Sequence, residues 1–297
     1  MMQADDLKGV ITAIVTPFHE DRELDKDGLK RLTRFLLENG VHGIMTTGGN
    51  GEFAHLLREE KRLVTDIVVK EVKGVIPVIA GTAACSTRET QLLSHDAQEV
   101  RADAVIVTPP YYYKLPDESI YRHFQLLTEH LDIPIIIYNN PLYTGHNLSP
   151  CLIDKLADLK GIIGLKQSNS DFGQLVEAIR RSGEKIAILT GIDSQFYPSL
   201  CAGAKGIFST AACVIPKHMV QIFDLCQDGR HEQAFDLHMM IQELNCLLEY
   251  DPGYVSPCKE ALGMLGLPGG PVREPLPELN PAEREALKGA LRALHLL

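Results

Sequence analysis

Eight short apolar runs recur along most of the chain, and this recurrence limits the fold more than any other feature of the sequence. They begin near Val10, Gly43, Val75, Ala104, Ile133, Ile162, Ala187 and Gly206. Successive starts therefore differ by 33, 32, 29, 29, 29, 25 and 19 positions. A run that stays apolar without alternation, such as residues 133–138, is typical of a strand buried on both faces of a parallel sheet.

Amphipathic stretches separate these runs. Residues 25–39 carry apolar side chains at helical spacing behind an aspartate, and residues 86–100 open on a serine N-cap with a glutamate three positions on. Eight strand–helix units in roughly 210 residues fit a closed (β/α)8 TIM barrel of the α/β class. An open, doubly wound sheet is the alternative.

The strand pattern stops near residue 229. Helical stretches are expected near 231–250, 257–266 and 281–296, joined by the Pro/Gly-rich segment GLPGGPVREPLPEL. We therefore predict a barrel domain over residues 1–228 and a small C-terminal helical domain over residues 229–297.

Composition and charge exclude several classes of partner. The chain is 45% hydrophobic and 23% charged, which is ordinary for a globular protein, and its formal net charge is -10. That balance opposes binding to nucleic acid or to an anionic membrane, because both need clustered Lys and Arg. No apolar run reaches the roughly 18 residues of a membrane span, and the acidic start lacks an apolar signal region.

Cysteine and histidine usage predicts a cytoplasmic protein without a metal. The seven cysteines are scattered, their number is odd, and no CxxC occurs, which suits reduced thiols better than a disulfide framework. The eleven histidines show no HExxH or other ligand spacing.

A lysine ends the sixth run, in the stretch IIGLKQSNS. In a (β/α)8 barrel the carboxyl ends of the strands carry the active site, so Lys166 would face the barrel mouth. Partial desolvation favours a neutral amine, which can attack a ketone and form a Schiff base. The imine is an electron sink that supports making or breaking a C–C bond. The alternative is a charge that meets water where a strand surfaces.

Two further groups lie at the ends of other runs. Tyr138 ends the fifth run, and its phenol can shuttle protons or simply cap a core strand. Gly49, Asn50 and Gly51 follow the second run, and consecutive amides at such a turn can cradle an anion. The same letters match a dinucleotide fingerprint ending at Ala54, which we discount because it follows the second strand of an apparent barrel.

At these residues the sequence resembles the dihydrodipicolinate synthase/N-acetylneuraminate lyase family of Schiff-base aldolases, along essentially its whole length. The most specific motifs are GxxGE at 48–52, YN-x-P-x-x-TG at 138–145 and IIGLK at 162–166. The resemblance implies a (β/α)8 barrel with a C-terminal helical domain, usually in a tetramer built as a dimer of dimers. It implies no cofactor, because the imine on Lys166 supplies the electron sink.

The resemblance also implies residue roles. Lys166 matches the Schiff-base lysine, and Tyr138 matches the tyrosine that shuttles protons and contacts the keto acid. Gly49 and Asn50 fall where the family has a pair, often of hydroxyl residues, that binds the pyruvate carboxylate. Tyr112 aligns with a tyrosine that reaches the neighbouring subunit's site in the synthases. One extra residue, Pro110, lies nearby, so Tyr111 is an alternative to Tyr112 in this role.

Three departures from the family pattern bear on the substrate. Gly49 lacks the first hydroxyl, and GxNGEF resembles 4-hydroxy-2-oxoglutarate aldolases, while glycine at this place resembles certain sugar-acid dehydratases. Tyr143 stands where the synthases carry an arginine for the carboxylate of the aldehyde, and a phenol cannot replace a bidentate guanidinium. The segments LKQSNSD and GID resemble the sialic-acid and keto-deoxy-sugar-acid lyases. They make Asp193 and Ser209 candidates for sugar-hydroxyl contacts, with a helix N-cap as the alternative for Asp193.

Together these features predict a class I lyase that cleaves or forms a 2-keto(-3-deoxy) acid from pyruvate and an aldehyde. We expect it to be closer to the keto-deoxy-sugar-acid or 4-hydroxy-2-oxoglutarate aldolases than to true dihydrodipicolinate synthase. A 2-keto-3-deoxy sugar-acid dehydratase and dihydrodipicolinate synthase itself are the nearest alternatives. An NAD(P)-binding oxidoreductase and a non-catalytic keto-acid-binding barrel are alternatives from other classes.

Overall fold

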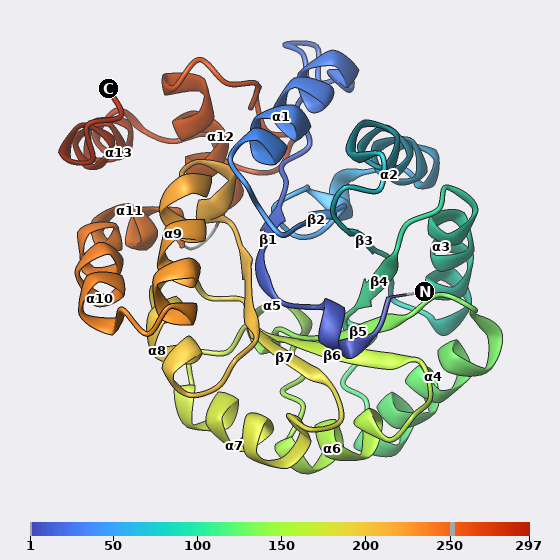
Figure 1. Ribbon diagram of the computed structural model, residues 1–297. Helices are drawn as coiled ribbons and strands as arrows, with labels where there is room; N and C mark the ends of the chain where they lie inside the picture. The colour runs from blue at the N-terminus through green and yellow to red at the C-terminus, as the bar shows by residue number, and fades with distance from the viewer. Residues whose placement is uncertain (1, 250–252) are drawn as a thin grey trace.

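A closed barrel of parallel strands forms the centre of the computed structural model, which describes residues 2–249 and 253–297 (Figure 1). Each strand pairs with the next along the chain, and the last pairs with the first. Over the described residues the strands are β1 (Gly9–Ala13), β2 (Gly43–Thr46), β3 (Val78–Gly81), β4 (Ala104–Val107), β5 (Ile135–Asn139), β6 (Ile162–Gln167), β7 (Ala187–Thr190) and β8 (Gly206–Ser209). The predicted (β/α)8 TIM barrel is confirmed, and the open sheet is not formed.

All the predicted strands are present, and two begin later than their apolar runs. β3 and β5 begin just after Pro77 and Pro134, a few residues beyond the runs that start near Val75 and Ile133. A proline has no N–H to donate to the neighbouring strand, so the ladder starts after it. Every strand residue except Tyr138 is buried, as a parallel sheet covered by helices requires.

Helices ring the barrel on its outside (Figure 1). They are α1 (Lys26–Glu38), α2 (Arg58–Val72), α3 (Thr87–Glu99), α4 (Asp117–His130), α6 (Pro150–Ala157), α7 (Phe172–Ser182), α8 (Phe196–Cys201) and α9 (Pro216–Gln227). The two helices predicted in detail begin as expected. The side chain of Asp25 accepts a hydrogen bond from the amide of Gly28, and Ser86 accepts one from the amide of Glu89.

Short helical turns shape the rim at the carboxyl ends of four strands. They follow β2, β5, β7 and β8 in the chain. These turns are η2 (Phe53–His55), α5 (Pro141–Thr144), η3 (Asp193–Gln195) and η4 (Ala211–Cys213); a further turn, η1 (Ala4–Asp6), precedes β1.

The C-terminal part is helical, as predicted. Residues 229–249 and 253–297, as far as the structure describes them, contain helices and no strand. The helices are α10 (His231–Met240), α11 (Gln242–Leu248), α12 (Val255–Met264) and α13 (Pro281–Ala293). Cys258, Leu262 and Leu291 belong to the same buried cluster as side chains of the barrel helices, such as Leu32 of α1 and Met219 of α9. The division into two domains at residue 229 stays a prediction.

None of the helices described here combines the length and the apolar character needed to cross a membrane.

Candidate active site

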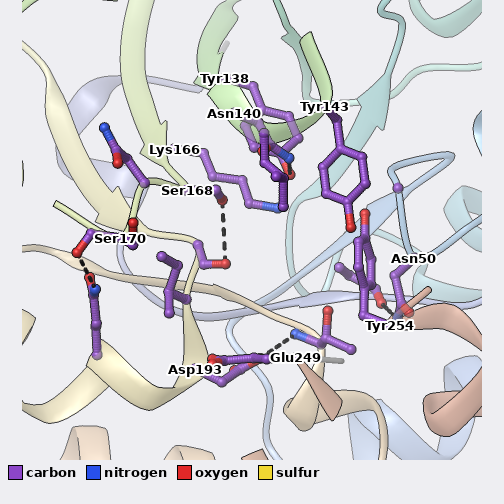
Figure 2. Close-up of a pocket in the computed structure, with 18 of the residues that line it drawn as sticks. Asn50, Tyr138, Asn140, Tyr143, Lys166, Ser168, Ser170, Asp193, Glu249 and Tyr254 are labelled. Carbon is purple, nitrogen blue, oxygen red and sulfur yellow. Dashed lines mark hydrogen bonds between the residues drawn. The ribbon is translucent and has the colours of Figure 1, made fainter. Parts of the chain in front are cut away.

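A cavity of about 630 Å³ opens at the carboxyl ends of the strands, where the sequence placed the chemistry. Its walls come from the loops after β2, β5, β6, β7 and β8 and from the segment between α11 and α12 (Figure 2). The predicted site residues that line it are Gly49, Asn50, Tyr138, Tyr143, Lys166 and Asp193.

Lys166 and Tyr138 face the cavity from adjacent strands. They are partners in the β5–β6 register, and Lys166 Nζ lies 4.2 Å from the centroid of the Tyr138 ring. The lysine is only 6% exposed, and no described residue forms a hydrogen bond or an ion pair with its amine. Gly191 makes room for it, because a Cβ there would lie 2.5 Å from Lys166 Cε. The amine is therefore held in place by packing and left free for a bound ligand.

Asn140 orients the phenol of Tyr138. Asn140 Nδ2 donates a hydrogen bond to Tyr138 Oη at 2.9 Å. Because the phenol oxygen accepts this bond, its own proton remains available for a ligand. Asn140 was not predicted from the sequence. The preceding residue, Asn139, is buried and bonds to Asn147 and Gln167. The YNN segment thus combines one residue that supports the loop with one that serves the site.

The turn after β2 presents unpaired amides. No described residue accepts a hydrogen bond from the backbone N–H groups of Gly49, Asn50 or Gly51. The turn is closed by a bond of 3.0 Å from Glu52 N to the carbonyl of Gly49, and Glu52 itself is left-handed at φ 57°. This geometry suits the anion cradle predicted for these residues.

The side chain of Asn50 has a different orientation from the one its expected role requires. Asn50 Nδ2 donates to the carbonyl of Ala13 at 2.6 Å and to Cys258 Sγ at 3.6 Å, and its Oδ1 is buried without a partner. Both N–H groups of this amide are therefore engaged, and the side chain has no free donor for a carboxylate. In this structure the backbone amides, rather than the Asn50 side chain, are the donors for an anion.

Tyr254, which sequence analysis missed, stands beside this turn (Figure 2). A Cβ built on Gly49 would lie 1.8 Å from Tyr254 Oη, so the phenol occupies the place of a side chain at position 49. The Tyr143 ring packs edge-on against the Tyr254 ring, with centroids 5.8 Å apart. Burial and the neighbouring phenols of Tyr138 and Tyr143 hold the pKa of Tyr254 well above its usual value. In the sequence, the missing side chain at Gly49 was the only indication that another residue could fill this place.

Asp193 and Ser209 bond to each other and to the turn that follows β8. Asp193 accepts hydrogen bonds from Ser209 Oγ and from the amides of Thr210 and Ala211, and Ser209 accepts one from Ala212 N. Asp193 lines the cavity at 2% exposure, whereas Ser209 is fully buried beneath it. The sugar contacts of both residues stay a prediction. The N-cap alternative for Asp193 is wrong, because Asp193 opens η3 and caps the η4 turn instead.

Burial raises the pKa of Asp193 to about 7, and the nearby charge of Glu249 adds to the effect. The hydrogen bonds from Ser209, Thr210 and Ala211 oppose the shift but do not cancel it. A carboxyl group with this pKa changes its charge near neutral pH, inside the cavity.

The wall opposite the anion cradle is rich in hydroxyl, amide and carboxylate groups. Glu249, also missed from the sequence, accepts bonds of 2.7 Å from both the amide and the hydroxyl of Ser194. Among the described residues that line the cavity, Lys166 is the only basic side chain. The remaining polar side chains of this wall are those of Ser168, Asn169, Ser170 and Gln195.

Tyr112 does not line the cavity of its own chain. It is 86% exposed, in a left-handed conformation at φ 83°, and its ring lies 5.0 Å from that of Tyr113. Tyr111 instead packs near Phe53 and borders a second, smaller cavity that also touches Tyr138. The role expected for Tyr112, in the site of a neighbouring subunit, stays a prediction.

Comparisons with known proteins agree with this geometry. The model of the dihydrodipicolinate synthetase family matches residues 6–294. The 4-hydroxy-tetrahydrodipicolinate synthase of Methanopyrus kandleri is 37% identical over 293 residues, which cover 98% of this chain and 97% of that protein. That of Desulforamulus reducens is 37% identical over 297 residues and the full length of both chains.

Solved structures give the same result. Dihydrodipicolinate synthase from Aquifex aeolicus has a TM-score of 0.93 and 34% identity, covering 98% of this chain and 99% of that one. The Escherichia coli K12 prophage protein YagE, solved in complex with pyruvate and described as a member of the dihydrodipicolinic acid synthase family, has a TM-score of 0.94 and 30% identity at the same coverage.

These comparisons correct one expectation. A closer similarity to the keto-deoxy-sugar-acid or 4-hydroxy-2-oxoglutarate aldolases is not borne out, because the similar curated relatives carry the synthase name. The expected family is confirmed. The chain belongs to the dihydrodipicolinate synthetase family, whose members are pyruvate-dependent enzymes of the class I aldolase type that act through a lysine Schiff base and need no external cofactor.

Proposed function

We propose that this chain is a class I carbon–carbon lyase that joins pyruvate to an aldehyde, or releases pyruvate from a 2-keto(-3-deoxy) acid, through an imine on Lys166. One observation carries the proposal. Lys166, Tyr138 and the turn residues Gly49 and Asn50, whose backbone amides have no acceptor among the described residues, all line a single cavity of about 630 Å³. Nucleophile, proton shuttle and anion cradle are the three parts that imine chemistry on a keto acid requires.

The steps follow from the positions of these groups. The keto-acid carboxylate binds the amides of residues 49–51, which brings C2 toward Lys166 Nζ. The amine attacks C2, and Tyr138 donates its proton to the leaving hydroxyl, so that water departs and the imine forms. In cleavage, the C3–C4 bond breaks and its electrons enter the imine to give an enamine, while the C4 hydroxyl loses its proton and the aldehyde leaves. Protonation of the enamine at C3 and hydrolysis then return pyruvate and the amine.

The polar wall favours an aldehyde that carries hydroxyl groups and no carboxylate. Tyr143 stands where the synthases carry an arginine. The described residues that line the cavity include no arginine. Glu249 would repel a second carboxylate, and so would Asp193 when it is ionised, whereas hydroxyls can donate to both. Ser168, Asn169 and the remaining amides of the wall can both donate hydrogen bonds to a polyol and accept them from it.

A second candidate is 4-hydroxy-tetrahydrodipicolinate synthase. It is favoured by the names of the similar relatives, at 37% identity over nearly the whole chain. It requires the carboxylate of aspartate semialdehyde to bind without the arginine, beside Tyr143. We therefore rank it second.

The proposed function is tested by trapping the imine. The protein is incubated with pyruvate and borohydride, and its intact mass and peptides are measured. We expect a reduced pyruvyl adduct on Lys166, absent in Lys166→Ala and retained in the exposed control Lys160→Ala. Pyruvate binding without an adduct would contradict the proposal and indicate a non-catalytic keto-acid-binding barrel.

Product analysis then separates the candidates. Aspartate semialdehyde with pyruvate tests the synthase, and 2-keto-3-deoxy sugar acids test the lyase. Release of pyruvate from a sugar acid supports the lyase. A product that has lost water but keeps its whole carbon chain indicates the dehydratase instead. Condensation of pyruvate with aspartate semialdehyde, without turnover of any sugar acid, indicates the synthase. Titration of NAD(P)H fluorescence tests the oxidoreductase alternative.

We also propose that the chain forms a homotetramer in which Tyr112 approaches a neighbouring subunit. The exposure of Tyr112 and Tyr113, at 86% and 73%, supports an aromatic contact surface. One solved relative, 32% identical, is described as a monomeric variant, so light scattering on this protein is the relevant measurement. A monomer in solution would contradict this proposal.

A further inference from the structure

A tyrosine from the C-terminal helical part reaches into the barrel mouth. Tyr254 lies directly before α12, and its ring borders the same cavity as Lys166 (Figure 2). A Cβ on Gly49 would lie 1.8 Å from Tyr254 Oη and 3.1 Å from Cζ. A hydroxyl and a side chain at position 49 therefore compete for one place, and in this chain the hydroxyl of Tyr254 fills it.

The surroundings of this hydroxyl suit a ligand anion. The amides of Gly49, Asn50 and Gly51 have no acceptor among the described residues, so an anion bound to them lies next to Tyr254 Oη. Burial keeps the pKa of the phenol well above its usual value, so the group holds its proton and remains a donor.

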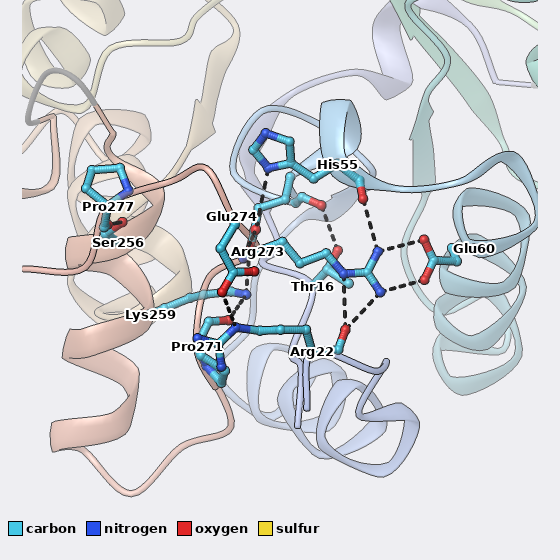
Figure 3. A network of polar contacts seen from close by, with 12 residues as sticks. Thr16, Arg22, His55, Glu60, Ser256, Lys259, Pro271, Arg273, Glu274 and Pro277 are labelled. Carbon is cyan, nitrogen blue, oxygen red and sulfur yellow. Dashed lines mark hydrogen bonds and ion pairs between the residues drawn. The ribbon is translucent and has the colours of Figure 1, made fainter. Parts of the chain in front are cut away.

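A buried network fixes the phenol relative to the amides. Glu52 directly follows the turn, and its carboxylate pairs with Lys259 of α12 at 2.5 Å, with side chains 0% and 2% exposed. Glu52 also accepts a bond of 2.9 Å from the amide of Arg273, whose guanidinium is held by both oxygens of Glu60 (Figure 3). The turn and the helix that follows Tyr254 are thus joined by buried charges, which hold the hydroxyl beside the amides.

We propose that Tyr254 is a further substrate-binding residue, whose phenol donates a hydrogen bond to the keto-acid carboxylate held by the amides of residues 49–51. This inference rests on the proposed function, because it requires a keto acid in the cavity. It assigns the C-terminal helical part a direct contribution to the site.

The test uses Tyr254→Phe, which removes only the hydroxyl, with Tyr121→Phe on α4, away from the cavity, as the matched control. Borohydride trapping is measured against pyruvate concentration. A hydrogen bond to a charged group is worth about tenfold or more in affinity, so the half-saturating pyruvate concentration rises about tenfold in Tyr254→Phe. The maximal adduct on Lys166 is unchanged, and Tyr121→Phe matches the wild type.

A ketone without a carboxylate separates this role from packing or proton transfer. Trapping of acetone is expected to be equal in the wild type and Tyr254→Phe, because acetone makes no bond to the anion site. If Tyr254→Phe weakens the trapping of acetone as much as that of pyruvate, the inference is overturned. It is also overturned if the half-saturating pyruvate concentration in Tyr254→Phe equals that of the wild type. In both cases a wild-type adduct on Lys166 leaves the proposed function standing.

The two proposals fail in different ways. If the wild type gives no adduct, the proposed function fails, and calorimetric titration with pyruvate tests Tyr254 by itself. Binding weakened about tenfold in Tyr254→Phe then supports the carboxylate contact. Equal binding overturns it, and so does a wild type that does not bind pyruvate.

Discussion

Lys166 Nζ lies 4.2 Å from the centre of the Tyr138 ring, and the two residues are direct partners in the register of β5 and β6. The distance follows from the sheet, since parallel neighbours in register project their side chains to the same side of the barrel. Lys166 and Tyr138, the proposed nucleophile and proton shuttle, are therefore positioned by backbone hydrogen bonds of the sheet.

Removing the phenol hydroxyl tests the shuttle. We expect Tyr138→Phe to form the imine on Lys166 at least about 100-fold more slowly, because a positioned acid or base contributes about that factor or more. The equilibrium amount of imine changes little. Trapping with borohydride at timed intervals measures the rate. A rate equal to that of the control variant Tyr121→Phe on α4 would contradict the role of Tyr138.

A side chain at position 49 and the hydroxyl of Tyr254 compete for one place, so we expect a serine at position 49 to substitute for the hydroxyl of Tyr254. Gly49→Ser alone places a side chain 1.8 Å from Tyr254 Oη, so we expect weak pyruvate trapping. Tyr254→Ala alone also weakens it, because the donor is lost. The double variant has room for the serine hydroxyl, and we expect it to trap pyruvate better than either single variant. Losses that simply add would show that the two residues do not share one place.

Breaking the buried ion pair destabilises the protein. Lys259→Met leaves Glu52 as an uncompensated buried charge, which typically costs about 3–5 kcal/mol. The control Lys185→Met removes two surface ion pairs, with Asp154 and Asp158, and is expected to cost about 1 kcal/mol or less. Urea unfolding measures both. A loss for Lys259→Met as small as that of the control would be evidence against a structural role for the pair.

Asp193 predicts a pH dependence of stability. Its folded pKa of about 7 lies above the unfolded value, so between roughly pH 4 and 7 the folded state binds the proton more tightly. This group therefore stabilises the fold increasingly as the pH falls through 7, by at most about 1.4 kcal/mol per pH unit. We expect the wild type to gain stability relative to Asp193→Asn between pH 8 and pH 5.

Urea unfolding at three pH values measures this gain. The exposed Asp132→Asn variant controls for the loss of a carboxyl group. A difference between wild type and Asp193→Asn that does not change with pH would show that the buried carboxyl does not titrate in this range.

The barrel and the convergence of its candidate site residues could be predicted from the order of the residues. Strand and helix periodicity is local, and once alternating units imply a closed parallel barrel, the carboxyl ends of all strands must meet at one mouth. Lys166, Tyr138 and the turn at residues 49–51 each end or follow a strand, so their convergence needed no further information. Even the two late strand starts have a local cause, in Pro77 and Pro134.

Other features depend on contacts between distant segments. Tyr254 reaches Gly49 only because α12 packs against the barrel and is held by the Glu52–Lys259 pair, and no periodic pattern encodes that approach. The orientation of Asn50 is set by the carbonyl of Ala13, and the partners of Asp193 are set by the turn after β8. Periodicity specifies which residues reach the mouth of the barrel, whereas side-chain packing and hydrogen bonds between segments specify which atoms they present there.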